Sequence, residues 1–335
     1  MEPQHGYYDP IVYVVPEREQ GWTLKTLMSS RLGVSRKLTS RLKMTERGIM
    51  LNGERVYISV HVQAGDVVEL RMEREVSDDI LPEEMPLDIL YEDRDLLIVN
   101  KPAGVIVHPT HGHYTGTLAN GVVYHWAQRG EQIRFRPVHR LDRETSGVLA
   151  IAKNPYIHQH ISEQMIAGTV DKTYRAIVHG HPQPEQGRIE GPIDRDPANP
   201  HVRMVTPDGY PAATRYRTLE SYPGARASLV ELELESGRTH QIRVHMTHIG
   251  CPLLGDDMYK YADESALTTE EWAAAKQVDT WINRQALHAF RLSFVHPSSG
   301  VRMTFEAPFP PDLAALEQQL KTNHFLQHPH ERKEM

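Results

Sequence analysis

Cysteine and long apolar runs are scarce in this sequence. The 335 residues include a single cysteine, Cys251, which excludes an internal disulfide and a zinc site built from several cysteines. No apolar run approaches the roughly 18 residues that a membrane-spanning helix needs. The N-terminal sequence MEPQHGYYDP lacks the charged and then apolar pattern of a secretion signal. We therefore expect a cytoplasmic protein without a membrane segment.

Positive charge is also in short supply for the chain as a whole. Lys and Arg number 37 against 44 Asp and Glu, a net charge of −7 that on average argues against binding to nucleic acid. Hydrophobic residues make up 39% and charged residues 24% of the chain, ordinary values that exclude wholesale disorder. The length allows two domains, each with a core of its own.

The charge is, however, distributed unevenly along the chain. Between Gly21 and Met72 there are nine Lys and Arg against four Asp and Glu, a local net charge of +5. The stretch EREVSDDILPEEMPLD that follows is acidic and contains Pro82 and Pro86, a composition typical of a solvated linker. These shifts predict four parts: a small basic domain over residues 1–74, an acidic linker over 75–88, a large domain over 89–322 and a polar tail over 323–335.

The basic domain has the pattern of a short strand, two helices and a β-turn unit. Residues 11–15 favour a strand, apolar residues between Leu24 and Met28 recur at helical spacing, and Ser35 is a plausible N-cap for a second helix. Asn52-Gly53 predicts a hairpin turn. Cations on the two helices form a surface suited to phosphate contacts, and a basic but merely solvated helix pair is the alternative. The candidate RNA-binding residues are Lys25, Arg31, Arg36, Lys37, Arg41 and Lys43.

Beyond the acidic segment, strand patterns outnumber helix patterns. Apolar runs predict strands at DILYEDRDLLIVNKP, VLAIA, TYRAIVHG, ASLVELELE, HAFRLSFVH and VRMTFEAP. Helices are expected over residues 155–167, 241–248, 270–284 and 311–321. Because the elements do not alternate as in a βαβ series, the fold class that we predict is α+β, with a mixed, mostly antiparallel β-sheet in the large domain and a small N-terminal α/β domain.

One acidic residue stands inside a segment that is otherwise basic, small or apolar. In HRLDRETSGVLAIAK, Asp142 lies between Arg140 and Arg143 and precedes a strand-like run. Neighbouring cations favour the ionised carboxylate, so we expect the pKa of Asp142 to be lowered. Such a group is a poor general base near neutrality but a permanently available nucleophile. A structural ion pair is the alternative.

Two further residues fit chemistry on a nucleic-acid base. Tyr174 lies on a predicted strand and offers a ring face for a base taken out of its stack. Arg243, in a helix-leading segment with several histidines, could orient a carboxylate and anchor phosphate. A half-buried strand tyrosine and an arginine that covers apolar surface are the alternatives.

Histidine is frequent, with 20 residues, and two groups raise the question of a metal. They are His108, His111 and His113, and His240, His245 and His248. Neither spacing matches a strong metal template. Histidines of an RNA-binding protein more often contact phosphate or backbone groups. We therefore predict no metal site.

Taken together, these segments resemble the RluA-type pseudouridine synthases. HRLDRETSG is similar to the signature of that family, and LIVNKPAGVIVHP, KTYRAIVHG, GRTHQIRVHM and RQALHAFRLSFVHP follow in the order found in the family. The resemblance covers roughly residues 87–310. Ahead of it, SRKLTSRLKMTERGIMLNGERV resembles the small αL-motif RNA-binding domain named after ribosomal protein S-four.

The resemblance implies roles for individual residues. Asp142 corresponds to the catalytic aspartate, Tyr174 to the tyrosine that stacks on the target base, and Arg243 to the arginine that pairs with the aspartate. Arg140 and His240 are expected to bind the substrate. The family uses no metal, nucleotide or redox cofactor. GDDMY is followed here by Lys260 and an insert to about residue 284, which would either contact RNA or cover the fold.

The implied function is isomerisation of specific uridines in structured RNA to pseudouridine. Large-subunit ribosomal RNA is the expected substrate because family members with this N-terminal domain often act there. A synthase directed at transfer RNA, a non-catalytic RNA-binding or ribosome-assembly factor, and a metal-dependent hydrolase are the alternatives. Family habit favours a monomer without a membrane partner.

Overall fold

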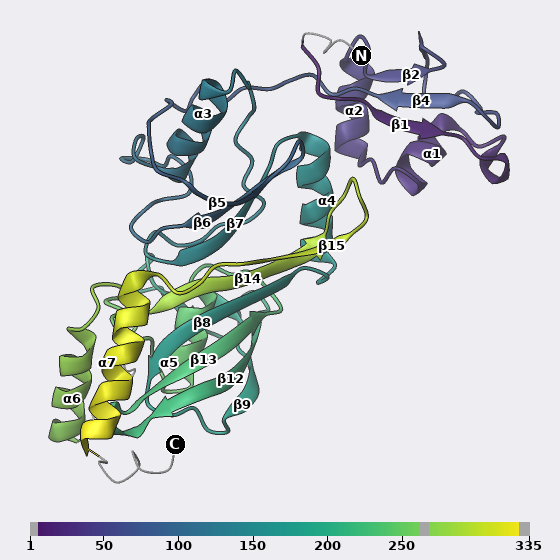
Figure 1. The fold of residues 1–335 in the computed structure, drawn as a ribbon. Helices are drawn as coiled ribbons and strands as arrows, with labels where there is room; N and C mark the ends of the chain where they lie inside the picture. Colours follow the sequence, from purple (N-terminus) through teal and green to yellow (C-terminus); the bar gives the residue numbers. More distant parts are fainter. Residues whose placement is uncertain (1–5, 261–267, 328–335) are drawn as a thin grey trace.

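The structure, a computed structural model, describes residues 6–260 and 268–327. A small domain formed by the N-terminal residues lies at one end of a larger domain built on a long twisted sheet (Figure 1). In the part of the chain so described, no helix is long and apolar enough to cross a membrane.

The small domain packs two helices on a four-stranded antiparallel sheet. Its elements are β1 (Ile11–Val14), a 3-10 turn (Glu17–Glu19), α1 (Leu24–Ser30), α2 (Arg36–Met44), β2 (Ile49–Leu51), β3 (Glu54–Arg55) and β4 (Val67–Leu70), with strand order β1-β4-β2-β3. The hydroxyls of Thr23 and Ser35 accept the first free amides of α1 and α2. Asn52 and Gly53 both have positive φ, as the predicted hairpin requires.

The larger domain is built on a nine-stranded sheet in which one pair, β7 with β14, is parallel and the other pairs are antiparallel. The strands of the sheet are β5 (Asp88–Glu92), β6 (Leu96–Lys101), β7 (Ser146–Ala152), β8 (Asp171–His179), β9 (Gln186–Glu190), β12 (Ala213–Tyr222), β13 (Ala227–Leu234), β14 (Leu287–Val295) and β15 (Arg302–Glu306). A separate hairpin pairs β10 (Ile193–Arg195) with β11 (Arg203–Val205). The predicted α+β class with a mixed, mostly antiparallel sheet is confirmed.

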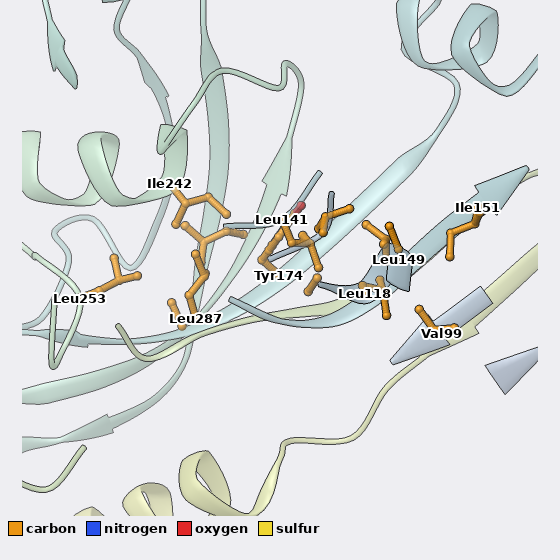
Figure 2. Close-up of a cluster of buried hydrophobic side chains, with 14 of the residues drawn as sticks. Val99, Leu118, Leu141, Leu149, Ile151, Tyr174, Ile242, Leu253 and Leu287 are labelled. Atoms are coloured by element: carbon orange, nitrogen blue, oxygen red, sulfur yellow. The ribbon is translucent and has the colours of Figure 1, made fainter. Parts of the chain in front are cut away.

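Helices cover the sheet on both faces, and each face has its own core. They are α3 (Leu118–Gln128), α4 (Pro155–Ile166), α5 (Gln241–His248), α6 (Thr269–Asp279), α7 (Pro311–Gln327) and a 3-10 turn (Pro223–Ala225). On one face, Leu141, Tyr174, Ile242 and Leu287 belong to a single buried cluster (Figure 2). On the other face α6 and α7 cover Ile177 and its neighbours. Alternate residues of β8 therefore belong to different cores.

Some elements differ from the sequence-based expectation. Helix α3 was not predicted, because LANGVVYHWAQ includes glycine and β-branched residues that favour helix weakly. Tertiary contacts decide it: Thr117 and Asn120 form a capping box, Trp126 is fully buried, and Met85 lies so close to Gly121 that a Cβ there would clash at 2.9 Å. The predicted final helix continues to Gln327, into the region expected to be a tail.

Part of the acidic segment over residues 75–88 is packed on the larger domain and is not solvated as expected. Ile80 is buried in the main core, and the hydroxyl of Ser77 accepts the amide of Phe135 at 2.9 Å. The amide group of Asn120 donates to the Leu81 carbonyl at 2.8 Å. The four-part division of the chain stays a prediction.

The small domain docks on the first turns of α4. The Tyr156 hydroxyl donates to the Leu32 carbonyl at 2.9 Å, and the Gln159 amide group accepts the Ser35 amide at 3.1 Å and donates to the Gly33 carbonyl at 2.6 Å. At its other end α4 supplies residues to a cleft in the larger domain. Figure 1 shows α4 between the small domain and the sheet.

Candidate active site

A cleft of about 1030 Å³ lies on the face of the sheet that carries α5. It is lined by residues from β8, β13, the start of α5 and the loop before β7. All five residues that the sequence singled out in the larger domain line it: Asp142, Tyr174, Arg243, Arg140 and His240. Segments up to about 100 residues apart in sequence thus meet at one site.

The loop that carries Asp142 is fixed by hydrogen bonds from two basic side chains, Lys101 and Arg284. The loop turns from Asp142 to Thr145, whose amide donates to the Asp142 carbonyl at 3.1 Å. The buried Nζ of Lys101 donates to the Arg143 carbonyl at 3.0 Å, and Arg284 donates to the Glu144 carbonyl at 2.9 Å. Burial lowers the pKa of Lys101 to about 7, but its amine donates in either protonation state. Donors on two successive carbonyls therefore fix the backbone that carries the Asp142 carboxylate.

A close approach of β7 to β14 supports the same loop. Gly147 has φ of +118°, and a Cβ at this position would lie 2.2 Å from the Ala289 carbonyl oxygen, so only glycine fits. Next to it, Ser146 and His288 share a hydrogen bond of 2.9 Å. The segments HRLDRETSG and RQALHAF, far apart in sequence, are therefore one packed unit.

The basic side chains nearest to the Asp142 carboxylate belong to the start of α5 and not to its own segment. Its Oδ2 lies 3.6 Å from Nη1 of Arg243 and 3.8 Å from Nε2 of His240. Arg143 turns instead to Glu144 and to the Gly104 carbonyl, and within the described residues no ion pair joins Arg140 or Arg143 to Asp142. Successive residues of a turn point in different directions, which explains why neither flanking arginine pairs with this carboxylate. That the two arginines keep Asp142 ionised stays a prediction.

Arg243 is itself fixed by a second aspartate that the sequence did not single out. Its Nε and Nη2 donate to the two carboxylate oxygens of Asp256 at 2.6 and 2.8 Å, and both side chains are buried. Burial opposes the charged guanidinium, but the hydrogen bonds and charge of Asp256, with the charge of Asp142, outweigh it and raise the pKa of Arg243. The arginine therefore presents Nη1 to Asp142 in a fixed, charged state.

Asp256 and Tyr259 belong to the segment GDDMY, which the sequence offered only as part of a family resemblance. The Tyr259 hydroxyl accepts the Arg203 amide at 2.8 Å and lies 2.8 Å from Nδ1 of His240. The guanidinium of Arg243 lies over the Tyr259 ring, 4.7 Å from its centroid. In the sequence, the only indication that Asp256 and Tyr259 support Arg243 and His240 was an acid followed three residues later by a tyrosine in GDDMY.

His240 begins α5 in the left-handed conformation, with φ of +58°. Such a backbone is strained for a residue other than glycine and is frequent at functional sites. Burial lowers the pKa of His240, although the charge of Asp142 opposes this. If the Tyr259 hydrogen is donated to Nδ1, the neutral ring carries its own hydrogen on Nε2, which faces Asp142.

Tyr174 lies on β8 at the floor of the cleft and is 7% exposed. Its ring packs in the cluster with Leu141, Ile242 and Leu287 (Figure 2). Burial first, and then the charge of Asp142, raise the pKa of its hydroxyl. The ring is thus neutral, rigidly held and close to the carboxylate. Its stacking role stays a prediction.

The six cations predicted to bind RNA lie on α1 and α2 of the small domain or at their ends, outside the cleft. Arg31 pairs with Glu19 and lies over Trp22, and Arg41 pairs with Glu75. The structure gives no carboxylate partner, among the residues it describes, for Lys25, Arg36, Lys37 and Lys43. These four are the most available for phosphate.

In the described ranges, one group of side chains has metal-ligand geometry, and it lies outside the cleft. Asp93, Asp95 and His296 have ligand atoms within 4.8 Å of one another. Oδ1 of Asp93 already accepts two backbone amides, and Oδ2 accepts the Tyr91 hydroxyl and lies 3.0 Å from Nε2 of His296. The group is explained as the support of a turn between β5 and β6.

The described part of the insert after Lys260 covers the fold. Val278 and Ile282 are buried with α7, and the Asp279 carboxylate accepts the Gly255 amide at 2.8 Å. Its first residues, 261–267, lie outside the described residues.

Comparison with known proteins agrees with the motifs. A family model described as RNA pseudouridylate synthase matches residues 95–248, and one described as the RluD ribosomal pseudouridine synthase N-terminal domain matches residues 12–68. An uncharacterized RNA pseudouridine synthase of Bacillus subtilis, YhcT, is 38% identical over 90% of this chain and 95% of its own.

Other relatives extend this agreement. The ribosomal large subunit pseudouridine synthase D of Zymomonas mobilis is 41% identical over 70% of this chain and 73% of its own. Among solved structures, human RNA pseudouridylate synthase domain containing 4 matches with a TM-score of 0.55 and 26% identity, over 70% of this chain and 93% of its own.

Proposed function

Because the chain belongs to the RNA pseudouridine synthase family, we propose that it isomerises one or more uridines of large-subunit ribosomal RNA, with Asp142 as the essential carboxylate. The observation that carries the proposal is the position of Asp142, whose side chain is 31% exposed, lies 3.6 Å from the buried Arg243 and lines the same cleft as the buried Tyr174. Its carboxylate accepts no hydrogen bond within the described residues, so it is available to a substrate.

The chemistry requires an ionised carboxylate and no external reactant. Attack of the aspartate on C1′ of the ribose, or abstraction of the C2′ proton to give a glycal, breaks the bond between N1 and C1′. The uracil leaves through N1 and turns, and C5 bonds to C1′; this displaces the aspartate or, in the glycal route, goes with return of the proton to C2′. C5 then gives up its proton to solvent and N1 takes one up, so the product is an isomer of the substrate. Arg243 keeps a fixed positive charge beside the carboxylate, and Tyr174 provides the face on which the extruded base stacks.

The assignment of ribosomal RNA rests on the small domain and on the relatives. The small domain matches the N-terminal domain of a ribosomal synthase, and relatives about 41% identical are named for the large ribosomal subunit. Lys25, Arg36, Lys37 and Lys43 provide cations for a structured RNA. RNA affinity is therefore expected to be strongly salt-dependent despite the net charge of −7.

Mapping pseudouridines in total RNA of a deletion strain and its parent tests the substrate, and tritium release from RNA labelled at uridine C5 tests the activity. We expect the loss of one or more pseudouridines from large-subunit ribosomal RNA and release by the purified protein. Loss from transfer RNA alone would move the substrate to that class. If neither loss nor release occurs, the protein is a non-catalytic RNA-binding or assembly factor.

A further inference from the structure

The cleft contains a partly buried lysine, Lys172, that has no role in the chemistry proposed for Asp142. Lys172 is the first cleft-lining residue of β8, two residues before Tyr174. Among the described residues its ammonium has neither a carboxylate partner nor a hydrogen bond, and burial lowers its pKa. A partly desolvated charge without a partner costs stability, so the fold alone does not account for it.

Elsewhere in the larger domain, exposed cations are largely matched with acids. Two carboxylates line the cleft, Glu235 and Asp142. Glu235 accepts hydrogen bonds from Arg188 and Arg215 at 2.6 to 3.1 Å, and the basic groups nearest to Asp142 are those of Arg243 and His240. Neither carboxylate pairs with Lys172, which leaves its ammonium for an anion from outside the protein.

The strand sets the place of that anion relative to the target base. Side chains two apart on a strand point to the same face, and here Lys172 and Tyr174 both line the cleft while Arg175 pairs with Glu231 on the other face. Two residues along a strand span roughly 6.6 Å. This is within the reach of a single nucleotide, with its base on Tyr174 and its phosphate at Lys172.

On the opposite wall of the cleft, Gly237 faces the ammonium. A Cβ at Gly237 would lie 3.7 Å from Nζ of Lys172, and, apart from the glycine and its two chain neighbours, no other described atom would lie within 4 Å of that Cβ. The φ of Gly237 is outside the left-handed region, so its backbone does not require glycine. A longer side chain at this position would cover the ammonium, and glycine leaves room for a ligand.

We propose that Lys172 binds an RNA phosphate that flanks the extruded uridine, so that β8 holds both ends of one nucleotide. The proposal rests on the proposed function, since it takes RNA as the ligand. A phosphodiester is the ligand that fits, because it is an anion that RNA brings into the cleft with every nucleotide. The positive charge of Arg140 and Arg238 at the same cleft adds to the attraction.

Replacement of the lysine separates this role from a structural one. Lys172→Met keeps the length of the side chain and removes its charge, so we expect kcat/KM for tritium release to fall about 10- to 100-fold. The urea midpoint should stay the same or rise, because an unpaired charge is lost. Lys172→Arg should restore most of the activity. Lys321→Met, which removes a lysine of α7 outside the cleft, is the matched control.

A chemical change in the RNA identifies the phosphate and needs no turnover. Hairpin RNAs with one methylphosphonate, 5′ or 3′ of the target uridine, are bound to Asp142→Asn and to Asp142→Asn/Lys172→Met over a range of salt. We expect one of the two neutralised phosphates to weaken binding to the first protein and to have no further effect on the second. Gly237→Leu, which would cover the ammonium, should weaken RNA binding as Lys172→Met does.

Three results would overturn the proposal. The first is a kcat/KM of Lys172→Met within twofold of the wild-type value. The second is a fall in kcat/KM that goes with a fall in the urea midpoint, and the third is a methylphosphonate that weakens binding as much in Asp142→Asn/Lys172→Met as in Asp142→Asn. The methylphosphonate binding experiment does not depend on pseudouridine formation. It therefore tests phosphate binding by Lys172 even if the proposed function fails. An inactive wild-type protein on ribosomal RNA would count against the function alone.

Discussion

The helix pair of the small domain and the cleft of the larger domain both contain cations, but in opposite physical settings. Arg36 and Lys37 of α2 are exposed and have no carboxylate partner among the described residues. Arg243 is 8% exposed and is fixed by two hydrogen bonds to Asp256. Exposed charges attract a polyanion at long range and are screened by salt. A buried and oriented charge acts at one atom.

The two regions are therefore expected to control different parts of the reaction. Loss of cations from the small domain should reduce encounter and affinity, and loss of order in the cleft should reduce turnover. The first turns of α4 contact the small domain through Tyr156 and Gln159, and its last turn, with Met165 and Ile166, lines the cleft. The helix thus holds the two regions at a fixed spacing, so that one RNA can contact both.

The largest effect is expected at the carboxylate. Asp142→Asn keeps the shape of the side chain but removes its charge and nucleophilicity. Tritium release should fall by at least about 10³-fold, with little change in RNA affinity measured by filter binding. Substantial residual turnover would contradict the assignment of Asp142. A large loss of RNA affinity would show that the cleft also contributes to docking, so that the two regions do not control affinity and turnover separately.

Removal of the support of Arg243 should be almost as severe. Asp256→Ala leaves a buried guanidinium without its partner, and we expect the free energy of unfolding to fall by about 3–5 kcal/mol, with a loss of kcat. The neighbouring Asp257 has a fully exposed side chain, so Asp257→Ala should stay within about 0.5 kcal/mol. Urea unfolding measures both. Equal effects at the two positions would mean that the pair with Arg243 contributes little.

Protonation of a cleft histidine should appear in the pH dependence of stability. Burial, with the charge of Lys172, lowers the pKa of His139 to about 4, whereas a histidine in the unfolded chain titrates near 6.5. Between these values the unfolded chain holds the extra proton, so stability is full above about pH 6.5 and falls as the pH drops towards 4.

The contribution of this histidine is isolated by comparison with His139→Gln. The variant should lose less stability than wild type between pH 7 and 4.5, by up to about 3 kcal/mol. Unfolding in urea at both pH values measures the difference. Identical pH slopes would show that His139 does not titrate in this range.

The ring of Tyr174 should matter more than its hydroxyl. Tyr174→Phe keeps the stacking face and should remain within about threefold of wild type, whereas Tyr174→Leu should lose about 10- to 100-fold in kcat/KM, the usual worth of one stacked base. Unfolding midpoints check that both variants remain folded under assay conditions. Equal activities of the two variants would argue against stacking.

The smallest effect is expected at the small domain. Arg36→Met/Lys37→Met removes two phosphate contacts, so KM should rise about 3- to 10-fold at unchanged kcat, and the slope of log affinity against log salt should fall by roughly 1.5. Lys321→Met is again the control for charge loss. A fall in kcat instead would mean that the helix pair also positions the target uridine.

Secondary structure was predicted well where the residues that stabilise an element are close to it in the sequence. The helix that begins after Ser35 follows from its N-cap and periodicity, and the helix over residues 241–248 follows from periodicity. The hairpin at Asn52-Gly53 follows from turn chemistry. Helix α3 was missed because its propensity is poor and its stability comes from Trp126 and the contact of Met85 with Gly121.

The sequence by itself determined the fold class and the family and singled out Asp142, Tyr174 and Arg243 as candidates, because these depend on periodicity and on motifs within single segments. The family resemblance also implied that Arg243 pairs with the aspartate, and the structure places the two side chains 3.6 Å apart. Only the tertiary structure decided the other charge contacts. It gave Arg140 and Arg143 no ion pair with Asp142, supplied Asp256 as the partner of Arg243, and gave Lys172 no carboxylate partner among the described residues. The physical reason is that an electrostatic interaction depends on the distance and burial of two groups, and folding alone sets both for groups far apart in the chain.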